Sequence, residues 1–288
     1  ATGSLSSRTA TVRTAAGTMR WATESGELDG ATVWRGSGDG SARLRPLFAD
    51  LLHSVGAIDG IRRVRFTSPH PKDMRPETFA AMAASPAACE HLHYPLQSGS
   101  DRVLALMHRG YTAERYLERV ADARAAIPGL AVTTDLIVGF PGETEDDFDQ
   151  TLAVAAAAEY DSAYTFIYSP RPGTEAAEMV DQFVDPDVVA DRFDRLKVVL
   201  ERSALAKHEA RIGRVEEVVV EGPSRKDHSV LTGRTRQNKL VHFAGVAPIR
   251  VGSYAEVTVT GAAPHFLRGE LVGVTAAATH RTRIAVVA

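Results

Sequence analysis

Four loops of this sequence gather hydroxyl, amide, imidazole and glycine residues, and each follows a short run typical of a β-strand. Loops that follow parallel strands meet at one edge of a sheet, where backbone N–H groups and helix N-termini can receive a polar ligand. We therefore expect a ligand site built from these loops. They comprise residues 65–71, 93–100, 133–144 and 165–174.

Asp135 is the most unusual residue of these loops, because the apolar residues 136–138 follow it directly. A carboxylate in such surroundings needs a partner or a ligand. Pairing with an arginine and contact with a substrate both remain open. Gly139 and Gly142 either turn the chain toward a helix or let a ligand approach the backbone. His93, considered by itself, is typical of a packed histidine or of one that caps a helix.

The chain contains a single cysteine, Cys89. An internal disulfide is therefore impossible, and this chain alone cannot supply a Cys-rich zinc site or the thiolates of an iron–sulfur cluster. No metal ligand and no catalytic residue is assigned from the sequence.

The elements that must position the loops alternate between strands and helices, which indicates an α/β fold with a parallel sheet or barrel. Helices are expected at residues 76–84, 101–108 and 112–127, after Thr144 and after Asp185. Strands are expected at residues 64–67, 91–96, 131–138 and 163–168. Beyond residue 211 the pattern changes to five short strands separated by turn residues, which is typical of a small antiparallel β-barrel of the OB type. These strands are expected at residues 215–221, 230–234, 240–243, 254–260 and 270–274.

Charge divides the chain in the same place. Residues 41–210 hold 18 basic and 26 acidic residues, whereas residues 211–275 hold nine basic and six acidic ones. A basic C-terminal module permits an anionic partner. RNA contact and a solvated rim on a structural barrel are both open for its candidate residues. These are Arg225, Lys226, Arg234, Arg236 and Lys239, with His242 and Phe243 as stacking partners.

The ends of the chain differ from the body. Residues 1–43 are rich in Gly, Ser, Thr and Ala without a sustained period, so we expect a disordered leader. We place domains at residues 44–209 and 210–276, and a tail at residues 277–288. No apolar run approaches a membrane span, and no signal-peptide pattern opens the sequence, so a cytoplasmic protein without a membrane partner is expected.

Taken together, the loops resemble the C-terminal part of the radical-SAM tRNA methylthiotransferases over residues 44–275. Their spacing matches that family, as do three motifs of the closing module, at residues 231–234, 240–243 and 262–265. The resemblance implies a partial radical-SAM (β/α) barrel followed by a TRAM domain that binds tRNA. It also implies an S-adenosylmethionine pocket at the strand ends, with Gln97, Ser98, Asp135, Ile137, Gly139 and Glu143 as its candidate lining.

The resemblance further implies the activity of the intact family enzyme, which would be monomeric. That enzyme would add a 2-methylthio group to N6-(dimethylallyl)adenosine beside the anticodon, using S-adenosylmethionine and two [4Fe–4S] clusters. The cluster ligands of the family do not occur in this sequence, so we interpret the chain as a fragment that is inactive by itself. A sister enzyme acting on threonylcarbamoyl-adenosine or a ribosomal protein is an alternative. A non-catalytic RNA-binding protein on a remnant barrel is a second one.

Overall fold

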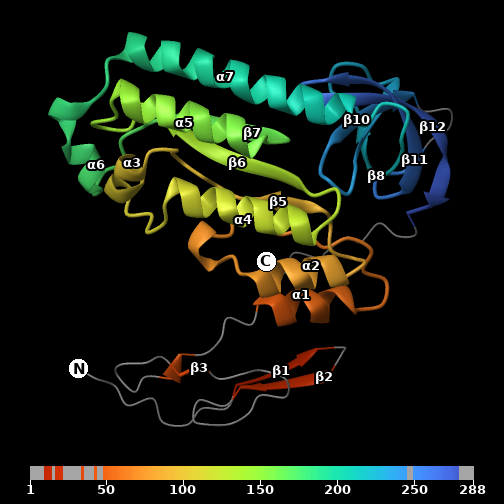
Figure 1. Cartoon of the computed structure of the whole chain (residues 1–288). Helices are drawn as coiled ribbons and strands as arrows, with labels where there is room; N and C mark the ends of the chain where they lie inside the picture. The colour runs from red at the N-terminus through yellow and green to blue at the C-terminus, as the bar shows by residue number, and fades with distance from the viewer. Residues whose placement is uncertain are drawn as a thin grey trace, which may run out of the picture. The chain divides into compact units, whose positions relative to one another are not determined.

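The computed structural model describes residues 10–14, 17–21, 34–35, 42–43, 48–244 and 249–278. Within these residues no helix is both long and apolar enough to cross a membrane. The described chain forms two compact units. The first comprises residues 1–65 and 75–89, and the second comprises residues 66–74 and 90–288 (Figure 1).

In the first unit, two antiparallel strand pairs precede two helices. β1 (Ala10–Thr14) pairs with β2 (Gly17–Trp21), and β3 (Trp34–Arg35) pairs with β4 (Ala42–Arg43). These four strands are what the structure describes of the predicted leader, and the rest of that prediction lies outside the described residues. Helices α1 (Phe48–Gly56) and α2 (Pro76–Ala84) pack on each other.

The strand predicted at residues 64–67 is wrong, because the structure has a single bridge there, between Val64 and Ala88. A short run of residues with strand propensity forms a strand only where a partner strand pairs with it along its length.

The second unit begins with a three-stranded parallel sheet in the order β5-β6-β7. Its strands are β5 (His91–His93), β6 (Ala131–Val138) and β7 (Ser162–Ile167). β5 is shorter than predicted, whereas β6 has the predicted bounds. The short helix η1 (Pro71–Asp73) precedes this sheet.

Helices connect these strands and lie along one side of the sheet (Figure 1). α3 (Asp101–Leu106) and α4 (Ala113–Ala126) join β5 to β6, and α5 (Glu145–Ala158) joins β6 to β7. After α6 (Glu175–Glu178) and η2 (Val180–Gln182), the long helix α7 (Pro186–Glu209) packs on α5, β6 and β7.

The helix starts follow from local capping, as the sequence predicts. Thr112 accepts a hydrogen bond from the backbone N–H of Arg115 at the start of α4. At the start of α5, Thr144 and Asp147 form a reciprocal capping box. Each cap satisfies N–H groups that the first helical turn leaves without a partner, which fixes where the preceding loop ends.

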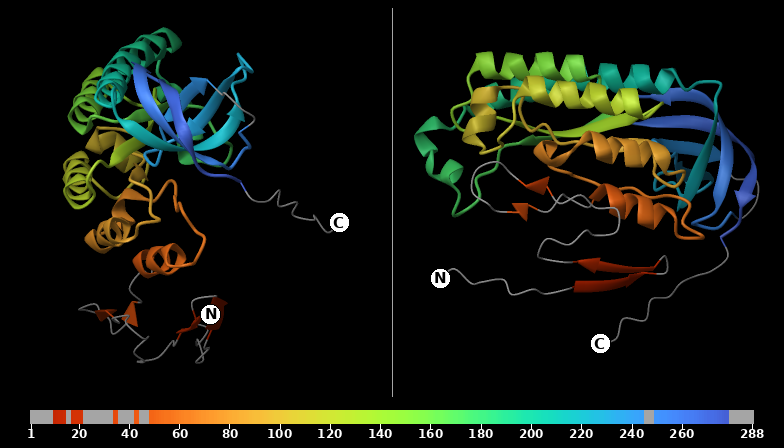
Figure 2. Two further views of the ribbon diagram at one scale, coloured as in Figure 1. Left: turned by 90° about the vertical axis from the view of Figure 1, so that its right-hand side faces the viewer. Right: turned by 60° about the horizontal axis from the view of Figure 1, so that its bottom comes forward.

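Five further strands close into a barrel in the order β10-β12-β11-β8-β9 (Figure 2). The barrel closes through the antiparallel pairing of β9 with β10. β10 pairs with β12 in parallel, and the other pairings are antiparallel. The α/β part followed by a small β-barrel confirms the predicted fold class, with this one parallel pairing added. The strands are β8 (Val215–Pro223), β9 (Val230–Arg234), β10 (Leu240–Ala244), β11 (Tyr254–Ala263) and β12 (Phe266–Ala276).

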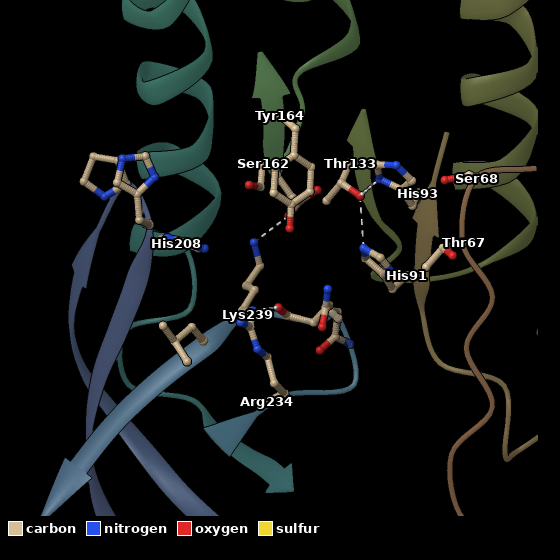
Figure 3. A pocket seen from close by; sticks show the side chains of 16 residues that line it. Thr67, Ser68, His91, His93, Thr133, Ser162, Tyr164, His208, Arg234 and Lys239 are labelled. Atoms are coloured by element: carbon tan, nitrogen blue, oxygen red, sulfur yellow. Dashed lines mark hydrogen bonds and ion pairs between the residues drawn. The ribbon is translucent and has the colours of Figure 1, made fainter. Parts of the chain in front are cut away.

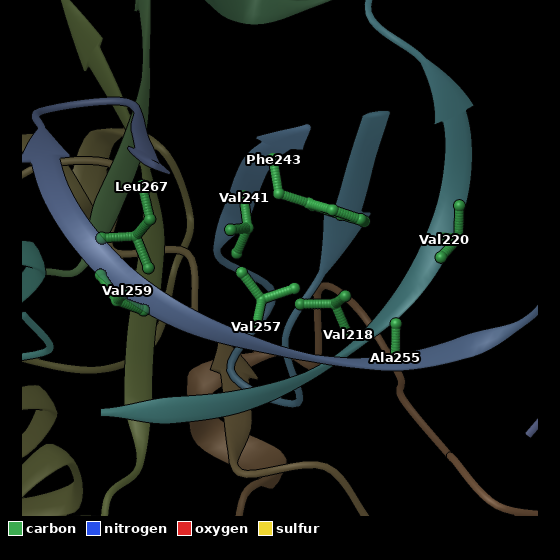
Figure 4. Packing of buried hydrophobic residues seen from close by; sticks show 8 residues of the cluster. All are labelled: Val218, Val220, Val241, Phe243, Ala255, Val257, Val259 and Leu267. Carbon is green, nitrogen blue, oxygen red and sulfur yellow. The ribbon is translucent and has the colours of Figure 1, made fainter. Parts of the chain in front are cut away.

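Alternate residues of these strands fill the barrel (Figure 4). The core holds eight buried apolar side chains, and removing them from water stabilises the closed form. Gly269 is required at its position, since a Cβ there would lie 2.4 Å from Val257 Cγ1 and 2.6 Å from the carbonyl oxygen of Thr258. The core residues are Val218, Val220, Val241, Phe243, Ala255, Val257, Val259 and Leu267.

Candidate functional site

A cleft of about 850 Å³ lies at the carboxyl ends of β5, β6 and β7. Its size falls within the range of small-molecule sites. Three of the six residues predicted for a cofactor line it: Gln97, Asp135 and Ile137. Phe140 and Phe166 add aromatic surface, so the cleft combines an apolar wall with a few polar groups.

Gln97 is held in an uncommon backbone conformation. Its φ is +71°, in the left-handed region that non-glycine residues adopt only rarely. Its N–H donates to the carbonyl of Asp135 at 2.8 Å, and its own carbonyl accepts from the N–H of Ile137 at 2.9 Å. Conformations of this kind cluster at ligand sites, where the surrounding structure maintains them.

The Asp135 carboxylate pairs with the imidazole of His93. His93 Nε2 lies 3.3 Å from Asp135 Oδ2, and 22% of the Asp135 side chain is exposed. Among the described residues, the charged side chain paired with Asp135 is His93 and not an arginine. His93 is therefore part of the site, although the sequence taken residue by residue assigns it a packing role. The alternation of His91 and His93 on one strand, and of Thr133 and Asp135 on the next, is the signal that could have found it.

The remaining predicted cofactor residues lie in packed surroundings. Ser98 is fully buried, and its hydroxyl lies 3.3 Å from Thr151 Oγ1. Glu143 is buried, and its Oε2 accepts from the N–H of Gly139 at 2.8 Å and from Arg192 Nη1 at 3.0 Å. Ser98 and Glu143 do not line this cleft, and their role in binding a cofactor stays a prediction.

Burial raises the pKa of Glu143, while the Gly139 N–H and Arg192 act in the opposite direction. Gly139 has a φ of +74°, and a Cβ there would meet Val189 at 2.6 Å. Contacts within the chain therefore stabilise the turn from β6 into α5. This favours the interpretation that Gly139 serves to turn the chain.

A second, smaller cavity of about 200 Å³ has polar walls (Figure 3). The strands of the parallel sheet contribute His91, His93, Thr133, Ser162 and Tyr164. The end of β9, the start of β10 and the turn between them contribute Arg234, Gln237, Asn238, Lys239 and Leu240. This polar chamber therefore lies where the small barrel meets the sheet.

A buried ion pair joins the two walls of the chamber. Lys239 Nζ lies 2.6 Å from Asp161 Oδ1, and the other carboxylate oxygen accepts from the N–H of Val132 at 3.0 Å. Only 4% of Lys239 is exposed. Burial lowers the pKa of Lys239, and Asp161 opposes this shift. Lys239 holds the barrel on the sheet, and the prediction that it contacts RNA is wrong.

The other residues predicted to contact RNA divide into two groups. Phe243 is 1% exposed inside the barrel, so its predicted stacking on a base is wrong. Its two-residue spacing from Val241 is the signal that placed it inward. Arg236 forms a bidentate pair with Glu90, with Nε 2.8 Å from Oε2 and Nη2 2.8 Å from Oε1. Arg236 therefore also helps to join the barrel to the sheet.

Arg225 and Lys226 are exposed, whereas Arg234 is half-buried and pairs with Glu221 at 3.4 Å. His242 is also half-buried and packs edge-on against Phe266, with ring centroids 5.0 Å apart. Burial lowers the pKa of His242. For these residues RNA contact stays a prediction.

Two family models agree with this architecture. Residues 30–155 match the family model of the radical SAM superfamily, and residues 209–272 match that of the TRAM domain. Among solved structures, coproporphyrinogen III oxidase from Escherichia coli, a radical SAM enzyme, is similar to this chain. The structural match covers 58% of this chain and 45% of the oxidase chain. The TM-score is 0.42 and the identity is 16%.

Curated relatives carry the name tRNA-2-methylthio-N(6)-dimethylallyladenosine synthase. The protein from Acidothermus cellulolyticus is 54% identical over 231 residues, which cover 79% of this chain and 46% of the relative. The protein from Moorella thermoacetica is 49% identical over 225 residues, which cover 78% of this chain and 50% of the relative. The chain thus spans about half the length of these relatives. With a radical SAM domain, a TRAM domain and this identity, it belongs to the radical SAM tRNA methylthiotransferase family.

Proposed function

We propose that the chain is part of a tRNA methylthiotransferase that adds a 2-methylthio group to N6-(dimethylallyl)adenosine beside the anticodon. The observation that carries this proposal is the 54% identity, over 231 residues, to a synthase named for that product. The order of a parallel α/β sheet and a small β-barrel supports it. We place the enzyme in the cytoplasm, where it would act on tRNA as a monomer.

The cleft fits S-adenosylmethionine by the chemistry of its walls. Asp135 can accept hydrogen bonds from hydroxyl or ammonium groups, and Ile137, Phe140 and Phe166 offer apolar surface to an adenine ring. Gln97 fixes the backbone beside them. When bound, S-adenosylmethionine supplies the methyl group and the adenosyl radical of this enzyme class, while the residues of the chain bind and orient it.

The iron–sulfur clusters of the family do not fit this chain. A [4Fe–4S] cluster is held by several thiolates, and the chain has only Cys89, which is buried. Among the described residues, no group of three or more His, Cys, Asp or Glu side chains could hold a metal ion. We therefore assign this chain to the cofactor and tRNA side of the reaction, and propose that it is inactive alone.

The test joins the chain to a segment of a relative that the chain does not match. The segment of the Acidothermus cellulolyticus synthase that precedes its match would be fused ahead of this chain, reconstituted without oxygen and incubated with tRNA that lacks the methylthio group. Mass spectrometry of the nucleosides should detect the 2-methylthio product from the chimera and none from the chain alone. An inactive chimera whose unfused parent synthase is active would contradict the proposal.

Two binding measurements separate this proposal from the RNA-binding alternative. The full chain should bind tRNA in filter-binding assays and S-adenosylmethionine in equilibrium dialysis. Binding of tRNA without any binding of S-adenosylmethionine would favour the non-catalytic RNA-binding protein.

A further inference from the structure

Four side chains form a continuous chain of hydrogen bonds along the parallel sheet. His91 Nε2 lies 3.1 Å from Thr133 Oγ1. His93 Nδ1 lies 3.0 Å from the same hydroxyl, and His93 Nε2 lies 3.3 Å from Asp135 Oδ2. We refer to His91, Thr133, His93 and Asp135 as the relay.

The strand period places these residues on one face. His91 and His93 are two residues apart on β5, and side chains two apart point to the same side of a strand. Thr133 and Asp135 have the same spacing on β6. The parallel register pairs His93 with Thr133, which brings the hydroxyl between the two imidazoles.

For an ionised Asp135 and a neutral His93, the chemistry of the groups sets the direction of each hydrogen bond. An ionised carboxylate can only accept, so His93 must donate to Asp135 from Nε2. The Nδ1 atom of a neutral His93 then accepts from the Thr133 hydroxyl. Because the Thr133 hydroxyl donates its proton to His93, its oxygen can only accept from His91, which donates from Nε2. Every donor in the relay thus points toward Asp135.

The relay joins the two cavities. His91, Thr133 and His93 line the polar chamber and are 3%, 8% and 7% exposed (Figure 3). Asp135 lines the cleft. Tyr164 meets the ring of His93 edge-on, with centroids 6.1 Å apart. The buried part is therefore packed in place, and its exposed end is a carboxylate at a ligand site.

We propose that His93, supported by Thr133 and His91, is a positioning residue that holds the Asp135 carboxylate toward hydrogen-bond donors of the cleft ligand. The inference rests on the proposed function in taking the cleft as a cofactor site. A hydrogen bond from His93 to one carboxylate oxygen restricts the rotation of the Asp135 side chain before the ligand binds. Ligand binding then costs less conformational entropy, and the other oxygen faces the ligand. The ligand group would be a pair of ribose hydroxyls or an ammonium.

The first measurement reads the relay directly. Long-range ¹H–¹⁵N correlation spectra of the full chain, at mildly alkaline pH, should show His91 and His93 as Nε2–H tautomers. Thr133→Val removes the hydroxyl at nearly constant volume and should change the imidazole signals of both residues, whereas Thr133→Ser should preserve them. An Nδ1–H tautomer at His93 would overturn the proposal, because His93 could not then donate to Asp135 while neutral.

The second measurement reads ligand binding. His93→Gln and Thr133→Val should weaken the binding of S-adenosylmethionine by about tenfold, since they loosen hydrogen bonds to an ionised group. Thr133→Ser should restore the affinity, and the exposed His228→Gln should leave it unchanged. Adenosine and methionine, titrated separately, distinguish hydroxyl from ammonium recognition, because only the one that contacts Asp135 should lose affinity in His93→Gln.

The outcomes separate the two proposals. Normal S-adenosylmethionine affinity in His93→Gln and Thr133→Val would overturn the positioning role and leave the proposed function intact. Binding of adenosine or methionine that depends on His93, without binding of S-adenosylmethionine, would support the positioning role and count against the proposed function. If the wild-type chain binds none of the three probes, the positioning role is wrong, and the chimera assay still decides the function.

Discussion

Replacing Lys239 by methionine tests how the small barrel is held on the sheet. The Lys239–Asp161 pair has an N–O distance of 2.6 Å, with side-chain exposures of 3% and 9%. Removing one partner of a buried pair leaves the other charge uncompensated, at a cost of about 3–5 kcal/mol. Asp161 keeps the hydrogen bond from the Val132 N–H, so we expect the lower end, about 3 kcal/mol.

For a chain of this size, that loss corresponds to a fall of about 6–12 °C in Tm. Calorimetry and urea unfolding of the full chain measure it. The exposed Lys226→Met is the matched control and should change the free energy of unfolding by less than about 0.5 kcal/mol. In the double variant with Asp161→Leu, part of the loss should be recovered, since no unpaired charge remains.

A Lys239→Met variant as stable as the wild type would refute this reasoning. So would a loss of tRNA affinity at unchanged stability, because Lys239 would then act at the surface.

Three further predictions follow from the described residues. Phe243→Ala should destabilise the barrel by about 3–5 kcal/mol, read from urea unfolding, because it leaves a cavity in the core; a loss below about 1 kcal/mol would contradict the packing. Burial lowers the pKa of His208 to about 4, so the unfolded chain takes up that proton first. This histidine should remove up to about 3 kcal/mol of stability between pH 6.5 and 4, and a His208→Gln variant should lack this part of the pH dependence. Replacing the exposed Arg225 and Lys226 by glutamine should reduce the salt dependence of tRNA binding by about one to two counterions, and an unchanged slope would mean that neither contacts phosphate.

The positions of helices and strands could be predicted from the sequence where they depend on local signals. The helix predicted at residues 76–84 and the strand at 131–138 have the observed bounds. Thr112 and Thr144 mark helix starts through their own hydroxyl groups, which needs no distant partner. The strand expected at residues 64–67 fails for the complementary reason, because strand pairing depends on a segment elsewhere in the chain.

The candidate site was predicted in part. Gln97, Asp135 and Ile137 line the cleft, because the carboxyl ends of neighbouring parallel strands lie at the same edge of a sheet. The side chains of Ser98 and Glu143 turn inward to satisfy Thr151, Arg192 and the turn backbone, and this choice depends on helices that pack behind the loops.

By itself the sequence determined the family, the order of its α/β and β-barrel parts, and the loops from which a ligand site is built. Only the tertiary structure decided what individual polar side chains do. Lys226 and Lys239 are the same residue type in one basic stretch of the sequence. In the structure Lys226 is exposed, whereas Lys239 is buried against Asp161. His93 and Asp135 meet only through the register of two strands, so their pairing is a property of the sheet. The physical reason is that burial and pairing arise from contacts between distant segments, whereas caps, periods and motifs are local.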